Sequence, residues 1–277
     1  MTTQWGAKAM GSTTNAVVPT DSSERAGSDQ RFARMRKYNV AMGALHVLQA
    51  LAIILLATDF TLPVTATFMT GPPGTPPADP AELFSIPVGL AVAAFLLFSG
   101  VAHWYIASAG YRRYVAGLKD NRNDARWIEY SLSASLMIVL IAMLTGISDV
   151  AALIAIFGVN ASMILFGLVQ ERVTQPGKDT SLLPFWMGCI AGAVPWIAIA
   201  VYLVAPGSSA EPPAFVYAIF VSLFIFFNSF AINMYLQYRK IGKWRDYLFG
   251  ESFYIALSLV AKSLLAWQVF AGTLAPE

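Results

Sequence analysis

Residues 249–271 read FGESFYIALSLVAKSLLAWQVFA, an apolar stretch with a single lysine, Lys262, close to its middle. An α-helix rises about 1.5 Å per residue, so about 20 residues cross the ~30 Å hydrocarbon core of a bilayer, and this stretch is long enough to span it. A lysine at that depth costs roughly 2.5–3.5 kcal/mol on membrane-insertion scales, so it needs a partner or a function. A desolvated amine is a competent nucleophile toward aldehydes. The structural alternative is a lysine that snorkels or only pairs two helices.

Apolar stretches of similar length recur along the chain. The sequence is 57% hydrophobic and 12% charged, whereas a soluble domain carries about 25% charged residues, so a water-soluble globule is excluded. The sequence predicts an all-α membrane protein, with a seven-transmembrane-helix bundle in residues 32–277 after a disordered tail in residues 1–31. The net charge of +2 gives no case for nucleic-acid binding, and the lone Cys189 supports neither a disulfide nor a cysteine metal site. The other six spans are predicted at residues 38–58, 83–109, 127–147, 150–169, 182–204 and 215–236.

Basic residues fall on one side of the predicted membrane. Of the 18 lysines and arginines, all except Lys262 lie in the N-terminal tail and in the second, fourth and sixth loops. The opposite loops and the C-terminus carry Asp and Glu but no Lys or Arg. By the positive-inside rule the N-terminus is cytoplasmic and the C-terminus extracellular, which predicts a multi-pass protein of the cell membrane. This orientation is the reverse of the common seven-helix receptors and light-driven pumps.

The first external loop, residues 59–82, is the only long loop of the predicted bundle. Its first half, residues 62–70, is rich in Val, Thr and Phe and is expected to form a short hairpin. Its second half, residues 71–80, contains five prolines and cannot join a sheet ladder. For this loop, a flexible cap without fixed structure is the alternative to an ordered lid or a contact with a neighbouring subunit.

Glu129 is the expected partner of Lys262, because it is the only carboxylate clearly inside a predicted span. Counted from a helix start near Arg122, Glu129 lies about 10 Å below the cytoplasmic surface and Lys262 about 18 Å. Either the long lysine side chain bridges this difference or the assumed helix start is too late. The alternative is an interfacial carboxylate paired with Arg126 or Arg122.

Several polar side chains gather at the level of Glu129. The chain has two histidines, and both fall at this depth in apolar helices, where one alone would more often be a satisfied core residue. Residues four apart share a helix face, which places Ser133 on the face of Glu129 and Ser258 on that of Lys262. This pattern favours a water-filled polar pocket over a metal site, because the sequence offers no third metal ligand at a suitable spacing. The predicted pocket residues are His46, Gln49, Ser99 and His103.

This pattern resembles the microbial-type retinal proteins. Seven spans, a lysine in the middle of the last one and Arg126-Trp127-Ile128-Glu129-Tyr130 at the start of the third are similar to that family, in which an aromatic-x-carboxylate step supplies the counterion of a Schiff base. The reversed charge bias, the glutamate in place of an aspartate and the stretch Ser258-Leu-Val-Ala-Lys262-Ser-Leu-Leu-Ala-Trp267 resemble the heliorhodopsins in particular. The likeness covers about residues 32–275.

The resemblance implies a bundle of microbial rhodopsin type, built around all-trans retinal. It implies a protonated Schiff base on Lys262 with Glu129 as counterion, the polar cavity described above, and a homodimer. The sixth span lacks the proline and tryptophan of the pumps, so Phe226 or Phe227 is expected to form that wall of the pocket. The other retinal-site residues that the resemblance implies are Ser133, Ser258, Tyr130, Met163 and Gly167.

The predicted function is light sensing without net ion pumping, and not enzymatic catalysis. From Glu129 outward the third span offers only serines and apolar residues, while Glu171 and Glu251 fall at cytoplasmic rims, where solvated end charges are expected. A light-driven proton or other ion transporter is the alternative, because water and hydroxyl groups conduct protons without carboxylates. An enzyme or solute transporter that uses Lys262 as a nucleophile is a third hypothesis. The basic loops fit an unidentified cytoplasmic signalling protein or anionic lipid, although positive-inside topology alone accounts for them.

Overall fold

The computed structural model describes residues 22–174, 180–204 and 212–275. Its first helix, α1 (Ser22–Leu56), includes residues 22–31, which the sequence analysis assigned to the disordered tail. At the end of this part of α1, Arg31 pairs with Asp246 and Phe32 is buried. The remainder of the predicted tail, residues 1–21, lies outside the described residues.

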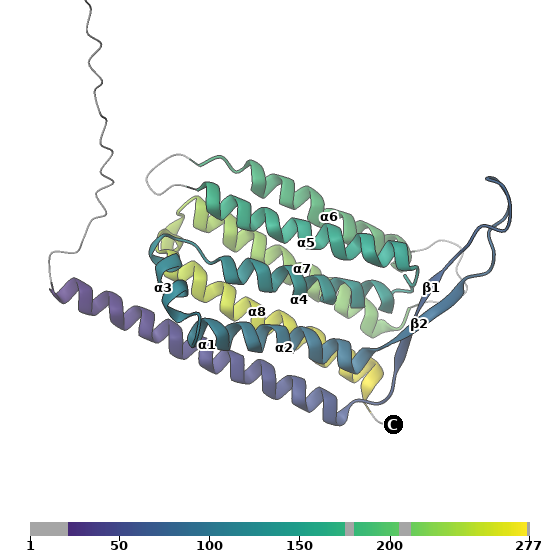
Figure 1. Ribbon diagram of the computed structural model, residues 1–277, viewed down its shortest axis with the longest axis horizontal. Helices are drawn as coiled ribbons and strands as arrows, with labels where there is room; N and C mark the ends of the chain where they lie inside the picture. Colours follow the sequence, from purple (N-terminus) through teal and green to yellow (C-terminus); the bar gives the residue numbers. More distant parts are fainter. Residues whose placement is uncertain (1–21, 175–179, 205–211, 276–277) are drawn as a thin grey trace, which may run out of the picture.

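Seven of the described helices are long and apolar enough to cross a membrane, which confirms the predicted number of spans. They lie side by side in one bundle (Figure 1). A short eighth α-helix, α3, which the sequence analysis does not predict, joins the second and third spans. After α1 the helices are α2 (Val88–Ala107), α3 (Tyr111–Lys119), α4 (Asp124–Leu144), α5 (Val150–Val173), α6 (Leu183–Leu203), α7 (Ala214–Tyr238) and α8 (Tyr247–Val269), with a 3-10 turn η1 (Gly242–Arg245) before α8 and a π-helical turn η2 (Phe270–Leu274) after it.

The two ends of the bundle differ in character. We call the end that carries α3, η1 and the first residues of α4 and α8 the basic end, because Arg112, Arg113, Lys243 and Arg245 lie there. The opposite end carries a two-stranded sheet and is called the hairpin end; Figure 1 shows the two at the left and the right of the bundle.

The hairpin differs from the one predicted. Strand β1 (Thr61–Ala66) pairs antiparallel with β2 (Ala81–Pro87), so the partner of the first half of the loop lies beyond the prolines and not within residues 62–70. Residues 71–80 stay out of the ladder, as their prolines require. Strand β2 also replaces the expected start of the second span at residue 83, and α2 begins only at Val88.

Side chains at the loops fix where three of the helices begin. The side chains of Asn123, Asp149 and Asp246 accept hydrogen bonds from backbone N–H groups in the first turns of α4, α5 and α8, which would otherwise have no partner. The chain turns between α4 and α5 at Gly146, whose φ of 98° lies in the left-handed region.

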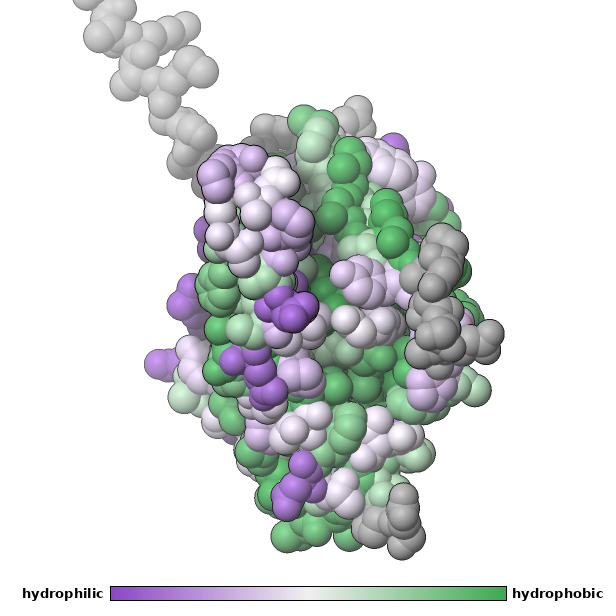
Figure 2. Space-filling view, turned by 90° about the vertical axis from the view of Figure 1, so that its right-hand side faces the viewer, coloured by the Kyte–Doolittle hydropathy of each residue, from purple (hydrophilic) through white to green (hydrophobic). Residues whose placement is uncertain are grey.

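The interior of the bundle is divided along its length. Toward the hairpin end it is filled by one apolar cluster that includes Phe95, Leu96, Ile138, Ile141 and Leu265. The outer faces of the helices carry many exposed large apolar side chains, as expected where lipid surrounds a bundle. Figure 2, which looks at the hairpin end, shows apolar residues along much of the outline. Polar and charged groups are buried in the other half, between Lys262 and the basic end.

Candidate functional site

Lys262 and Glu129 form an ion pair inside the bundle. Lys262 Nζ lies 3.1 Å from Glu129 Oε1, and the two side chains are only 4% and 9% exposed. Lys262 also donates to Ser258 Oγ at 2.9 Å, and Ser99 Oγ donates to Glu129 Oε1 at 2.6 Å. The expected difference in membrane depth between Glu129 and Lys262 is closed by the lysine side chain. Helical side chains lean toward the helix N-terminus, and α8 begins at the basic end. Of the two pairings considered for Glu129, the structure therefore has the one with Lys262.

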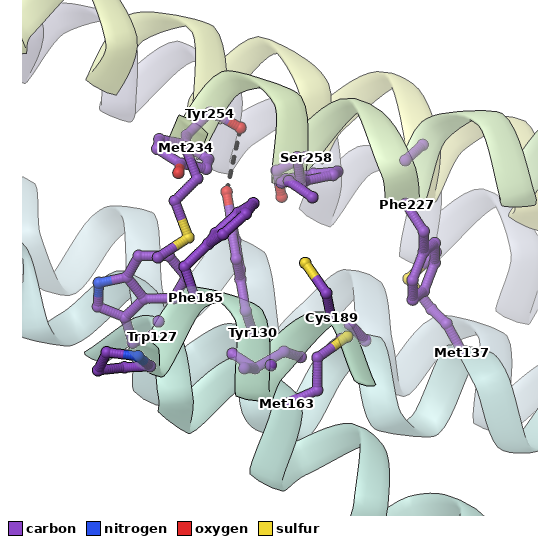
Figure 3. A pocket seen from close by; sticks show the side chains of 18 of the residues that line it. Trp127, Tyr130, Met137, Met163, Phe185, Cys189, Phe227, Met234, Tyr254 and Ser258 are labelled. Atoms are coloured by element: carbon purple, nitrogen blue, oxygen red, sulfur yellow. Dashed lines mark hydrogen bonds between the residues drawn. The ribbon is translucent and has the colours of Figure 1, made fainter. Parts of the chain in front are cut away.

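An apolar cavity begins at this ion pair. It extends from Lys262 and Ser258 on α8, between α4 and α7, to Met163 and Gly167 on α5. Figure 3 shows Ser258 and Met163 on opposite sides of the cavity. Its walls are almost entirely hydrocarbon and aromatic, so it suits an elongated apolar ligand that reaches an amine.

The remaining predicted pocket residues differ in their positions. Tyr130 and Phe227 line the cavity, and Tyr130 donates a hydrogen bond across it to the backbone oxygen of Tyr254 at 3.0 Å (Figure 3). Phe226 instead packs against the apolar cluster of the hairpin half. Ser133 is fully buried, does not line the cavity, and its hydroxyl has no hydrogen-bond partner within the described parts of the chain.

Gly167 allows Trp127 to form one wall of the cavity. A Cβ on Gly167 would lie 2.3 Å from the Trp127 ring, far inside contact distance. The ring cannot easily move, because its Nε1 donates to Glu171 Oε2 at 2.7 Å and the ring packs against that of Tyr254 in a T-shaped arrangement. A glycine is therefore needed here for close approach rather than for backbone conformation.

Gly167→Ala is accordingly expected to lower the free energy of unfolding by about 1–3 kcal/mol, the usual effect of overpacking. Gly158→Ala on the same helix is the matched control, because no atom lies within 4 Å of its added Cβ. The thermal midpoint of each purified variant measures the effect. Equal midpoints for the two variants would contradict the role assigned to Gly167.

A polar cavity lies on the other side of the ion pair. Ser99, His103 and Glu129 line it, together with Glu251 at the basic end. His46 is fully buried and stacks on His103, with ring centroids 5.6 Å apart and an interplanar angle of 13°. His46 does not itself line the cavity, and both its ring nitrogens have no hydrogen-bond partner among the residues that the structure describes.

Gln49 does not join this cavity. Its Oε1 accepts a hydrogen bond from Trp267 Nε1 at 3.0 Å, and its Nε2 donates to Leu45 O. The pair lies on the outer side of α1 and α8, where Trp267 is 39% exposed. The i,i+3 spacing of His46 and Gln49 therefore places only the histidine inward.

Glu171 and Glu251 are not solvated end charges, contrary to expectation. Each is only 1% exposed, and both pair with the buried Arg126, through Nη2 to Glu171 Oε1 at 2.5 Å and through Nη1 to Glu251 Oε2. The guanidinium also lies 4.0 Å from the centroid of the Tyr254 ring. Arg126 therefore does not pair with Glu129. It closes the polar cavity on the side of the basic end.

A hydrogen-bonded chain connects His103 to this cluster. His103 Nδ1 lies 2.7 Å from Asn39 Oδ1, Asn39 Nδ2 donates to the hydroxyl of Tyr114 at 3.3 Å, and that hydroxyl donates to Glu251 Oε1 at 3.3 Å. Burial first, and then the negative charge of Glu251, raises the pKa of the Tyr114 phenol well above its ordinary value. Tyr114 therefore remains a neutral donor to the carboxylate.

Several residues of the site were not predicted. For Glu251 a signal exists, since residues 251, 254/255, 258 and 262 repeat along one face of α8. Glu171 likewise lies four residues after Gly167. Asn39 lies seven residues before His46 on α1, so the same periodicity offers a signal for it. For Tyr114, on the separate helix α3, no such signal exists.

Comparisons with known proteins agree with this architecture. The family model described as Heliorhodopsin matches residues 35–274. Among solved structures, the chain is similar to the crystal structure of a light-driven proton pump, LR (Mac), from Leptosphaeria maculans, with a TM-score of 0.61, 14% sequence identity, and coverage of 86% of this chain and 93% of that chain. At this identity the likeness shows a shared fold. A search of the curated proteins found no match.

Proposed function

Because the chain belongs to the heliorhodopsin family, and is thus a retinal-binding rhodopsin, we propose that it is a light-sensing photoreceptor that holds all-trans retinal on Lys262 and moves no net ion. We place its N-terminus in the cytoplasm, on the support of the basic residues that gather at that end. A homodimer and a soluble signalling partner at the basic end belong to the same proposal, which includes no enzymatic activity.

The residues present fit a retinal group. The apolar cavity leads to a buried primary amine, which is the group that an aldehyde needs for a Schiff base. Trp127, Tyr130 and Phe227 provide flat aromatic walls, and Gly167 leaves room for one of them. When bound, retinal supplies absorption of visible light and a change of shape on isomerisation.

The chain's own groups have distinct tasks. Glu129 balances the positive charge at Lys262 Nζ, and Ser99 holds the carboxylate in position through its short hydrogen bond. His103 lines the polar cavity and provides a ring nitrogen where a proton released from the Lys262 nitrogen can be held, and His46 stacks on its ring. Arg126 pairs with both carboxylates and lies between that cavity and the basic end.

The observation that carries the proposal is the one-sided distribution of buried charge. In the described parts of the chain, the buried charged residues are Arg126, Glu171, Glu251 and Lys262. These residues, and Glu129 with its 9% exposed side chain, lie at the level of Lys262 or nearer the basic end. Toward the hairpin end the interior is the apolar cluster. A carboxylate relay for directional proton transport has groups on both sides of the switching nitrogen. Here the carboxylates lie on one side, which supports exchange with that side only.

Glu129→Gln should strongly shift the visible absorption of the pigment, because the positive charge at the Lys262 nitrogen loses its nearest counter-charge. Glu129→Asp is the matched control, since it keeps a carboxylate and should shift the absorption much less. Absorption spectra of the two variants reconstituted with retinal measure the effect. An unchanged spectrum in Glu129→Gln would refute the counterion role.

The absence of net transport is tested in cells supplied with all-trans retinal. External pH is recorded under illumination, with and without a protonophore, and the colour of the cells confirms that pigment is present. We expect coloured cells with a flat pH trace. A light-driven pH change that the protonophore abolishes would instead establish proton transport.

A further inference from the structure

We propose that Asn39 is a positioning residue that fixes His103 as the tautomer protonated on Nδ1, so that Nε2 is the nitrogen that takes up a proton from the polar cavity. The inference rests on the proposed role of that cavity in accepting a proton, and it assigns the proton acceptor to one atom. Asn39 is fully buried on α1, and His103 is 9% exposed on α2.

The orientation of the Asn39 amide follows from its other neighbours. Its Nδ2 lies 2.9 Å from the backbone oxygen of Met35, which can only accept a hydrogen bond. If the amide were turned over, Oδ1 would face this carbonyl oxygen and two acceptors would be in contact. The NH₂ group therefore points to Met35, and Oδ1 points to His103.

The tautomer of His103 follows in turn. An amide oxygen is an acceptor only, so at 2.7 Å the Nδ1 atom must carry the proton of this hydrogen bond. In a neutral imidazole the other nitrogen, Nε2, then has the free lone pair. A proton that leaves the Lys262 nitrogen and binds Nε2 would leave that nitrogen neutral and make the His103 ring an imidazolium with two N–H groups.

The second histidine has no such constraint. Both nitrogens of His46 lack a hydrogen-bond partner in the part of the chain that the structure describes, although its ring stacks on that of His103. The direction of the chain beyond Asn39 is consistent with the assignment, because Tyr114 accepts from Asn39 Nδ2 and donates to Glu251. The two rings therefore differ in their hydrogen bonding, and only His103 has a tautomer fixed by a protein partner.

The test is nitrogen NMR of the pigment in the dark, with the protein labelled at histidine. The chain contains two histidines, so only two imidazole rings contribute, and His46→Gln leaves the signals of His103 alone. We expect one protonated Nδ1 and one unprotonated Nε2 for His103. A protonated Nε2 with an unprotonated Nδ1 would overturn the proposal.

Asn39→Leu tests whether Asn39 is the cause. This variant removes the acceptor and should abolish the predominance of the Nδ1–H form, whereas Tyr114→Phe disturbs the same chain but leaves Asn39 Oδ1 in place and should preserve it. Persistence of the Nδ1–H form in Asn39→Leu would refute the positioning role. If Asn39→Leu gives no pigment, the tautomer of the His46→Gln protein still decides the assignment. The readout needs no light response, so it is independent of whether the protein senses light or transports ions.

Discussion

Lys262→Ala is expected to yield a folded protein that remains colourless when retinal is supplied. Lys262 is the only amine that lines the apolar cavity in the described chain, so no other side chain can hold retinal there. The loss should be complete rather than partial, and the absorption spectrum of the purified variant measures it. Lys243→Ala, which removes an exposed lysine from η1, should retain full colour.

The substitution also leaves Glu129 without its cation, which costs stability when a carboxylate is buried. The double variant Lys262→Ala/Glu129→Gln removes both charges and separates this effect from the loss of the attachment site. It should be more stable than the single variant and equally colourless. A coloured pigment in either variant would show that retinal is held elsewhere.

Arg126→Met is expected to destabilise the protein by about 3–5 kcal/mol, because it leaves two buried carboxylates without their cation. Glu171 and Glu251 retain hydrogen bonds from neutral donors, among them Tyr247 to Glu171 and Asn123 to Glu251, but these do not neutralise the charge. The denaturation midpoint of the purified pigment measures the effect.

Two further variants make this prediction specific. Arg122→Met breaks a pair with Asp120 in which both side chains are largely exposed, so it should have little effect. Adding Glu171→Gln and Glu251→Gln to Arg126→Met removes the unpaired charges and should restore much of the lost stability. If Arg126→Met were as stable as Arg122→Met, the buried cluster would contribute nothing to the fold.

Patterns within single segments predict much of this molecule. The seven spans follow from hydropathy and length. The ion pair between Glu129 and Lys262 follows from the small number of charged residues inside those spans. Helical periodicity correctly places Ser258 beside Lys262, since the two side chains are joined by a hydrogen bond. Such features depend on one helix or on one unusual residue, and the sequence contains that information.

Features that depend on several segments could not be predicted in this way. The burial of Glu171 and Glu251 requires Arg126 to reach both from a third helix, and a rim position read from one helix alone suggests solvent. Gln49 shows the opposite error, because its spacing from His46 suits an inward position while Trp267 offers it a partner outside. The hairpin was misplaced for a similar reason, since β1 pairs across the prolines with residues that are apolar enough to resemble a helix start.

The one-sided interior also has an electrical consequence. On the proposed function, charge that leaves the Lys262 nitrogen moves toward the basic end, where the buried charged side chains lie, and returns by the same route. The site then stores charge within the membrane once per cycle and carries none across it. A light flash should accordingly produce two transient currents of opposite sign whose integrals cancel.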